Sequence, residues 1–291
     1  MDETAKKLLI LQYCPSVTWK DQYLLLKHDP HLRKMTHLTA AEIARITGRS
    51  IKQAQIILHE FNSVSYNHLY SSLTKSQTTF VPIFDQRYPE PLKRLPQPPW
   101  VLFAIGDVRL MKHDRILAVV GARNGDEYGR KALQTIIPGL VEKHISIISG
   151  LAKGIDAFSH EEALNAGGKT IAVIAGGFQH FYPKENIALA RQIARDGLIL
   201  SEYAPHIKPE RWQFPARNRI VSGLSGGVLI VQAAKKSGSL ITANFAMEQG
   251  VDVFAVPGPI THPLSEGVHS LIADGAKIVH CADDILAELG M

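Results

Sequence analysis

The sequence predicts an α/β protein with an extended Rossmann-like fold, in which a doubly wound, mostly parallel sheet follows a small all-helical N-terminal domain. Two observations carry this prediction. Over residues 114–291, short apolar runs rich in β-branched residues alternate with segments of helical periodicity, as is typical of parallel strands covered by helices on both faces. Residues 1–70 contain helical patterns and no convincing strand. A chain of 291 residues, 45% hydrophobic and 20% charged, can bury the cores of about two domains.

The helical domain, residues 1–70, carries clear helix-start signals. Trp19–Lys27 is an apolar helix candidate. Thr39 followed by Glu42 is the pattern of a capping box that begins a second helix, and Ser50 is placed to cap a third. Two helices joined by such a turn are consistent with a helix-turn-helix that reads duplex DNA, and equally with a module for packing or protein docking. The residues leave both hypotheses open.

Residues 71–113 are predicted to be a linker and a proline-rich lead-in. Positions 71–78 are rich in Ser, Thr, Lys and Gln, a composition typical of linkers. A proline-dense stretch follows, with an apolar run at each end, Phe80–Phe84 and Val101–Ile105. These runs predict two short strands in an ordered lead-in.

The third region, residues 114–291, holds the predicted parallel sheet. The apolar runs that predict its strands are Ile116–Val120, Ile145–Ile148, Ile171–Ala175, Leu198–Leu200, Val228–Val231, Val253–Val256 and Lys277–Val279. Helices are expected near 126–142, 155–166, 185–196, 214–223, 239–249 and 265–274. In such a sheet, ligands bind at the carboxyl ends of the strands, beside the helix N-termini.

Glycines, cations and hydroxyls gather at these strand ends. They lie in the segments 121–124, 149–156, 176–178, 182–186, 214–219 and 235–239. Glycine lets a ligand approach the backbone, N–H groups at helix starts attract anions, and Arg or Lys adds charge. Several such elements at one sheet edge predict a phosphate-binding rim.

Charge and aromatic residues indicate what kind of phosphate this rim would bind. The net charge is +5, but residues 114–291 alone carry 17 cationic and 18 acidic side chains, so a polyanion site there must come from local clustering. Aromatic residues share loops with cations: Phe178, Phe181, Tyr182, Trp212 and Phe214 occur with Lys184, Arg211 and Arg217. This interleaving favours a nucleic-acid single strand, whose bases stack on rings while phosphates pair with cations. Burial under the sheet edge is the alternative for each ring alone.

The common nucleotide, metal and nucleophile motifs are not found. Gly168-Lys169-Thr170 precedes a strand, whereas a P-loop follows one, and no G-x-G-x-x-G follows the first parallel strand. Thirteen histidines and two cysteines show no zinc-ligand spacing. His160 is either a general base or a helix residue held by local hydrogen bonds, and we favour the second. The sequence therefore predicts no catalytic residue, metal or cofactor.

These loops, in this order, closely resemble the bacterial DNA-processing protein A family (DprA, also called Smf). The matching stretches are Val120–Arg123, Ser149–Ala157, Tyr182–Asn186, Phe214–Ile220, Ser237–Ala243 and Val256–Gly258. The lead-in matches too, at Asp85, Tyr88-Pro89 and Val101–Phe103. The resemblance covers about residues 80–291, and the helical N-terminal domain is variable in that family.

The resemblance implies a homodimer that binds single-stranded DNA without turnover. Family members protect incoming DNA in natural transformation and help load the RecA recombinase against single-strand-binding protein. By motif match, Arg123 and Lys184 are the principal phosphate contacts, and the segment around Val268–Ile278 carries the dimer contact. The full set of residues expected at the DNA is Gly121, Arg123, Ser149, Gly150, Lys153, Gly176, Phe178, Lys184, Asn186, Arg217, Asn218, Ser237 and Ser239.

A hypothesis from another class is a Rossmann-like hydrolase of the lysine-decarboxylase-like type, which cleaves nucleoside monophosphates. Such an enzyme carries a glycine-rich turn with a catalytic glutamate nearby. In this sequence Lys235 and Lys236 stand where that acid is expected. Glu202 and Glu248 are the nearest acids. An adaptor with a vestigial site is the third hypothesis.

Composition also bears on the compartment. No apolar run approaches the ~18 residues of a spanning helix, and two cysteines are too few for a disulfide framework. We expect a cytoplasmic protein with no membrane contact.

Overall fold

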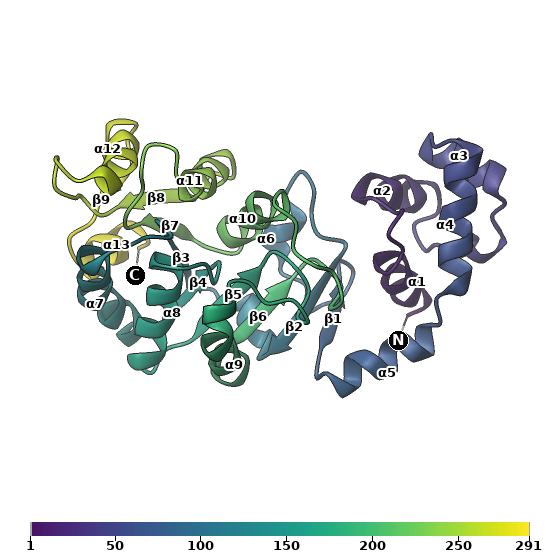
Figure 1. Cartoon of the computed structure of the whole chain (residues 1–291), viewed down its shortest axis with the longest axis horizontal. Coiled ribbons are helices and arrows are strands. Elements are labelled where there is room, and N and C mark those ends of the chain that lie inside the picture. Colours follow the sequence, from purple (N-terminus) through teal and green to yellow (C-terminus); the bar gives the residue numbers. More distant parts are fainter. Residues whose placement is uncertain (1, 291) are drawn as a thin grey trace.

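The computed structural model describes residues 2–290 and confirms the predicted fold class. Helices form the first part of the chain, and a nine-stranded, mostly parallel sheet forms the rest (Figure 1). None of the helices within the described residues is long and apolar enough to cross a bilayer.

The N-terminal region is built from α1 (Glu3–Gln12), α2 (Trp19–His28), the short η1 (Met35–His37), α3 (Ala40–Thr47), α4 (Ile51–Ser63) and α5 (Tyr66–Lys75). Side chains cap the starts of α2, α3, α4 and α5. The predicted caps are confirmed, since Thr39 and Glu42 form a capping box at α3 and Ser50 begins α4 in the same way. Each box satisfies backbone N–H groups that the first helical turn leaves without partners.

Two predictions in this region were incomplete. The segment 71–78 was expected to be a linker, but α5 continues to Lys75 and buries Leu69 and Leu73, which lie one turn apart on the same face. The Ser, Thr and Lys residues that suggested a linker cover the exposed face of this helix. No helix was predicted over residues 3–12, where α1 buries Leu8 and Leu9.

The sheet order is β1-β2-β6-β5-β4-β3-β7-β8-β9. The lead-in supplies β1 (Thr79–Pro82) and β2 (Val101–Gly106), which pair antiparallel, and β2 pairs antiparallel with β6. The parallel strands are β3 (Ile116–Val120), β4 (Ser146–Ser149), β5 (Thr170–Ile174), β6 (Leu198–Ser201), β7 (Gly227–Ile230), β8 (Asp252–Ala255) and β9 (Lys277–Ile278). The predicted lead-in strands therefore extend the same sheet.

Helices cover both faces of this sheet, so its strands are apolar throughout (Figure 1). The helices of one face are α7 (Glu127–Glu142), α8 (Ile155–Asn165) and α9 (Ile187–Asp196), and α13 (Ala282–Glu288) packs on α7. The other face carries α10 (Gln213–Gly223), α11 (Ser239–Glu248) and α12 (Glu266–Ala273). Along β3, Leu117 and Val119 join the core under α7, whereas Ala118 and Val120 join the opposite core.

The strand order places a topological switch beside β3. The chain runs outward from β3 through β4, β5 and β6, and then returns to β7 on the other side of β3. The loops that follow β3 and β7 therefore diverge and leave a crevice at the carboxyl ends of these strands.

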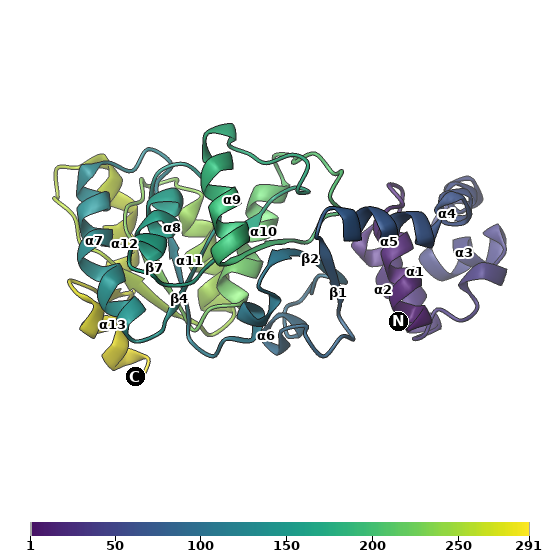
Figure 2. The same cartoon turned by 90° about the horizontal axis from the view of Figure 1, so that it is seen from below.

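The helical region packs against one end of the sheet (Figure 2). Trp19 stacks on Trp100 of the lead-in, with ring centroids 5.4 Å apart. The Trp19 indole N–H donates to the Pro98 carbonyl at 2.7 Å, and the Trp100 indole N–H donates to the Trp19 carbonyl at 3.1 Å. Aromatic stacking and two reciprocal hydrogen bonds thus fix this junction.

Candidate functional site

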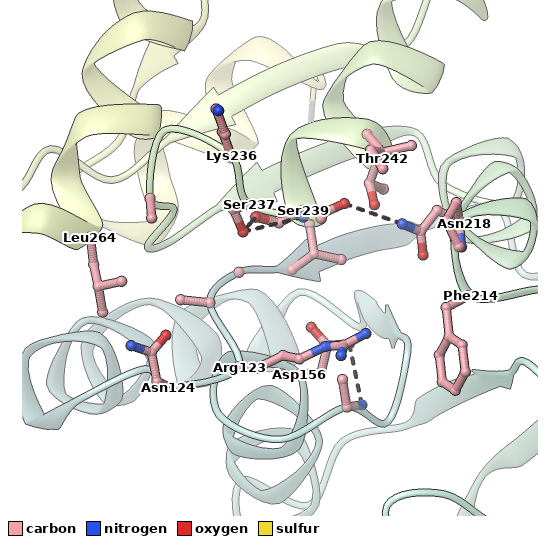
Figure 3. A pocket seen from close by; sticks show the side chains of 18 of the residues that line it. Arg123, Asn124, Asp156, Phe214, Asn218, Lys236, Ser237, Ser239, Thr242 and Leu264 are labelled. Atoms are coloured by element: carbon pink, nitrogen blue, oxygen red, sulfur yellow. Dashed lines mark hydrogen bonds between the residues drawn. The ribbon is translucent and has the colours of Figure 1, made fainter. Parts of the chain in front are cut away.

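A cavity of about 490 Å³ lies at the switch point, where the carboxyl ends of β3 and β7 meet. Its walls come from the loop after β3, the first turns of α10 and the segment that leads into α11. Figure 3 shows Ser237, Ser239 and Thr242 on one wall and Arg123 and Asn124 on the facing wall. The predicted position of the site at the strand ends agrees with this cavity.

Close backbone packing shapes the floor of the cavity. A Cβ atom at Gly121 would lie 2.7 Å from the Ile155 side chain, and one at Gly154, whose φ is +70°, would lie 2.7 Å from the Arg123 carbonyl oxygen. Only glycine allows these loops to come so close. The Asn186 amide group donates to the carbonyls of Leu151 and Ala152 at 3.0 Å each. These bonds tie the segment around Asn186 to the loop that follows β4.

Arg123 supplies an uncompensated positive charge. Its side chain is exposed, has no ion-pair partner among residues 2–290, and lies 5.6 Å from the Phe214 ring centroid. Lys236 also lines the cavity without an ion pair in the described part of the chain. A guanidinium held over a ring can donate hydrogen bonds to a phosphate while the ring stacks on a base.

Arg217 is a buried cation rather than an exposed contact. It is only 5% exposed, donates to the Val173 carbonyl through its guanidinium, and reaches Asn218 Oδ1 with Nε at 3.2 Å. Its guanidinium also occupies the space that a side chain at Gly150 would need. Burial lowers the pKa of Arg217 to about 10, and the charge of Asp156 opposes that shift. The buried Arg217 guanidinium therefore packs between the carboxyl ends of β4 and β5.

Asp156 is the carboxyl group nearest the floor. Burial raises its pKa, and the nearby Arg217 opposes this shift. The backbone N–H of Ala152 donates to its Oδ2 at 3.3 Å. Because Asp156 and Arg217 are both buried, the exposed charge presented to the cavity comes from Arg123 and Lys236.

The start of α11 provides hydroxyl and N–H donors. The Ser237 and Ser239 hydroxyls lie 2.7 Å apart, and the Ser239 N–H donates to Ser237 Oγ at 3.4 Å. Asn218 Nδ2 donates to the Gly238 carbonyl at 3.4 Å, which links α10 to this turn. The N-terminus of a ten-residue helix with two hydroxyls is a favourable place for an anionic oxygen.

The structure brings six of the thirteen predicted site residues to the cavity. They are Gly121, Arg123, Arg217, Asn218, Ser237 and Ser239. Gly150 and Asn186 lie behind it as packing and tethering residues. Lys184 is exposed on the neighbouring η3 (Lys184–Asn186) without an ion pair within residues 2–290.

The remaining four predicted residues are engaged elsewhere. Ser149 is fully buried and donates to the Val119 carbonyl at 2.6 Å. Lys153 pairs with Glu185 at 2.5 Å, Phe178 packs into the core, and Gly176 sits against Pro209. None of them lines the cavity.

Sequence reasoning did not single out several residues that line the cavity. Asn124 follows Arg123 directly, and Thr242 lies one helical turn after Ser239, so helix periodicity was an available signal. Asp156 was not among the predicted site residues, and a carboxyl group is unusual in an anion site. Leu264 comes from η4 (Pro263–Ser265), far along the chain, and nothing in its local sequence indicates this position.

His160 is a structural residue, as we favoured. It is fully buried, and its Nδ1 lies 2.6 Å from the Thr170 hydroxyl, which donates to the Ile147 carbonyl. Burial, with a smaller contribution from Arg217, lowers its pKa to about 3.

The predicted aromatic set divides between two places. Phe214 lines the cavity, and Tyr182, which is exposed, meets it edge to face at 5.7 Å between ring centroids. Trp212 lies outside this cavity and packs edge to face on Tyr203. Tyr182 and Phe214 therefore connect the cavity to the loop that carries Lys184.

Fold and site together define a Rossmann-like protein with a cationic, aromatic-walled anion site at the switch point of its sheet. Comparison with known families gives the particular one. Residues 79–290 match the family model of DNA recombination-mediator protein A, and the chain belongs to this family.

Relatives agree with this assignment. DNA processing protein DprA of Bacillus subtilis is 49% identical over 209 residues, which span 72% of this chain and 70% of that protein. The Streptococcus pneumoniae protein of the same name is 43% identical over 86% of this chain and 87% of its own length. An X-ray structure of DprA from S. pneumoniae matches with a TM-score of 0.86 at 39% identity over 99% of both chains.

A second structure carries information on a ligand. DprA from Helicobacter pylori, solved to examine its single-stranded DNA binding mode, matches with a TM-score of 0.67 and 30% identity. The match covers 73% of this chain and 95% of that one.

Proposed function

We propose that this protein binds single-stranded DNA without chemical turnover and acts as a recombination mediator. The observation that carries the proposal is the unpaired Arg123 guanidinium held over Phe214 at the mouth of the switch-point cavity. Phosphates of the strand bind Arg123, Lys184 and the donors at the start of α11, while bases face Phe214 and Tyr182. The single-stranded DNA binding of the H. pylori relative supports this assignment.

The other predicted site residues take supporting roles in this proposal. Gly121, Gly150 and Gly176 allow close packing of the strand-end loops, and Asn186 and Arg217 hold these loops in place. Ser149, Lys153 and Phe178 act on the DNA only through the loops that they stabilise.

The direct test is fluorescence anisotropy of a labelled single-stranded oligonucleotide, compared with its duplex. We expect tight binding that prefers the single strand, because only unpaired bases can stack on the rings. Equal affinity for duplex, or no binding, would contradict the proposal.

We propose a cellular role that is supported by family membership. The protein protects incoming strands in the cytoplasm during natural transformation and helps RecA displace single-strand-binding protein. This is tested by RecA filament formation on DNA coated with single-strand-binding protein. Faster filament formation with this protein present is expected, and an unchanged rate would refute the loading role.

The protein is proposed to act as a homodimer through the C-terminal segment Val268–Ile278. Support comes from an exposed apolar side chain within it, since Ile278 on the edge strand β9 is 47% exposed. A dimer presents two DNA sites and gains avidity. Light scattering should give twice the chain mass of 32.1 kDa, and Ile278→Glu should shift it to the monomer.

The described residues offer no suitable carboxylate for the nucleotide-hydrolase hypothesis. Glu202 is held by Arg219 in an ion pair of 2.7 Å, and neither Glu202 nor Glu248 lines the switch-point cavity. Asp156 does line it, but this carboxyl is buried beside Arg217. We therefore expect no ribose phosphate from nucleoside monophosphates above the uncatalysed background, and sustained release would restore the hydrolase hypothesis.

A further inference from the structure

A second, larger cavity of about 750 Å³ lies between the helical region and the Rossmann-like unit. Residues 11–22 form one wall, the proline-rich lead-in forms another, and the segments 202–219 and 245–249 close it. Ligand sites occur preferentially at such junctions between domains, where two surfaces supply the walls. Nothing in the proposed DNA-binding role uses this cavity.

All three tryptophans of the chain line this second cavity. Trp19 and Trp100 form a stacked pair with planes inclined by 24°. Trp212 is 60% exposed and stands almost perpendicular to Tyr203, at 87°. Because Trp19 also stacks on Tyr23 at 5.6 Å between ring centroids, its two faces are occupied, and the exposed ring of this cavity is Trp212.

Its charged groups are mostly acidic. Glu202 and Arg219 neutralise each other at 2.7 Å, whereas Glu210 and Glu248 have no ion-pair partner among the described residues. Both carboxylates are exposed, and the Trp212 indole N–H donates to Glu210 Oε2 at 2.7 Å, so neither carboxylate faces a cation beside the aromatic walls. Carboxylates accept hydrogen bonds and favour a donor of positive charge.

We propose that this inter-domain cavity binds a small organic cation, with a guanidinium, amidinium or ammonium head and an apolar body. Aromatic faces attract such a head through cation–π interactions, and Glu210 and Glu248 pair with it. The apolar body fills the space between the tryptophans. DNA is excluded as the ligand here because its phosphates would meet uncompensated carboxylates.

The two cavities are separate sites that share α10. Phe214 and Asn218 line the switch-point cavity, whereas Trp212 and Arg219 line the second one. The proposal therefore stands or falls independently of DNA binding.

Intrinsic tryptophan fluorescence gives a direct test, because every tryptophan lines this cavity. The full-length protein is titrated with benzamidine, benzamide and benzoate, which have nearly the same body and carry a positive, zero and negative charge. We expect saturable binding of benzamidine, binding of benzamide weaker by about tenfold, and none of benzoate. Calorimetry of the same titrations provides a readout that does not depend on fluorescence.

Two variants locate the cation. Glu210→Gln and Glu248→Gln should each weaken benzamidine binding several-fold and leave benzamide binding unchanged. The matched control is Glu142→Gln, an exposed position on α7 outside the cavity, which should change neither.

Several results would overturn the proposal. They are the absence of saturable benzamidine binding, equal affinities for benzamidine and benzamide, and benzamidine binding that is insensitive to both cavity variants. Binding of a blocked arginine peptide without binding of benzamidine would also overturn it, because the cation would then belong to a protein partner.

Discussion

The two cavities on either side of α10 differ in the sign of the charge that they leave uncompensated. The switch-point cavity has Arg123 and Lys236 without ion pairs, and the second cavity has Glu210 and Glu248 without ion pairs among the described residues. Both contain aromatic rings from α10 or the segment before it. The contrast indicates that unpaired charges, rather than shape or aromatic content, decide which ligand each cavity takes.

The buried arginines of α10 sharpen this contrast. Arg217 and Arg219 are two residues apart, and each lies near a carboxylate. Burial lowers the pKa of Arg217 to about 10, whereas burial of Arg219 is outweighed by its contact with Glu202, so that its pKa is raised. The charge of Arg219 is offset by its ion pair with Glu202, and Arg217, which the sequence predicts as a DNA contact, is buried.

The largest effect is expected from reversing the unpaired cations. Arg123→Glu combined with Lys184→Glu should weaken single-strand binding by about 1000-fold or more, because two phosphate contacts become repulsive. Anisotropy measures the loss, and circular dichroism checks that the fold is intact. The control is Lys52→Glu with Lys75→Glu in the helical region, which should change affinity little; an equal loss there would break the distinction between the regions.

Removal of a buried cation should affect stability instead. Arg217→Met leaves the Asp156 carboxyl buried without its cation, which should lower the free energy of unfolding by about 3 kcal/mol. Urea denaturation measures this, and adding Asp156→Asn should recover part of the loss because no charge is then stranded. Arg195→Met at an exposed pair should leave stability nearly unchanged, and a similar loss there would contradict the account.

The buried His160 side chain predicts that the free energy of unfolding depends on pH. Its pKa falls from 6.5 to about 3 on folding, so the unfolded chain takes up a proton that the folded protein refuses. Stability from this residue is complete above about pH 6.5 and falls by about 1.4 kcal/mol per pH unit as pH decreases toward 3. The difference in the free energy of unfolding between about pH 7 and pH 5 should therefore be about 2 kcal/mol smaller in His160→Gln than in the wild type. An unchanged difference would refute the assignment.

The smallest effect is expected from the helical region. Deletion of residues 1–75 should reduce single-strand affinity by less than about tenfold, because the unpaired cations of the DNA site all lie beyond it. The same deletion should abolish benzamidine binding, since residues 11–22 form one wall of the second cavity. A loss of DNA affinity well beyond tenfold would show that the N-terminal helices take part in binding the DNA strand.

Much of the fold could be predicted because the interior strands are short, continuous apolar runs. β3 matches its predicted range residue for residue, and the helices α7, α8, α10, α11 and α12 differ from theirs by one or two residues at an end. The helices α1, α5 and α13 were not predicted; they are short, and their stability depends on packing against neighbours that the local sequence does not reveal.

The candidate site could be predicted only in part. Glycines, serines and cations at strand ends placed it at the edge of the sheet where the switch-point cavity lies. Side-chain direction was the missing information: Ser149 ends β4 but points at the β3 backbone, and Arg217 turns inward to Val173. The pairing of Lys153 with Glu185 depends on loops 32 residues apart, which no local motif reveals.

The most direct test of the central claim is the salt dependence of single-strand affinity in the wild type and in Arg123→Gln. If Arg123 binds a phosphate, its loss reduces the slope of log affinity against log salt by about 0.7, the value for one contact on a single strand. A reduction of that size would support the account. An unchanged slope would contradict it, because the guanidinium over Phe214 would then contact no phosphate.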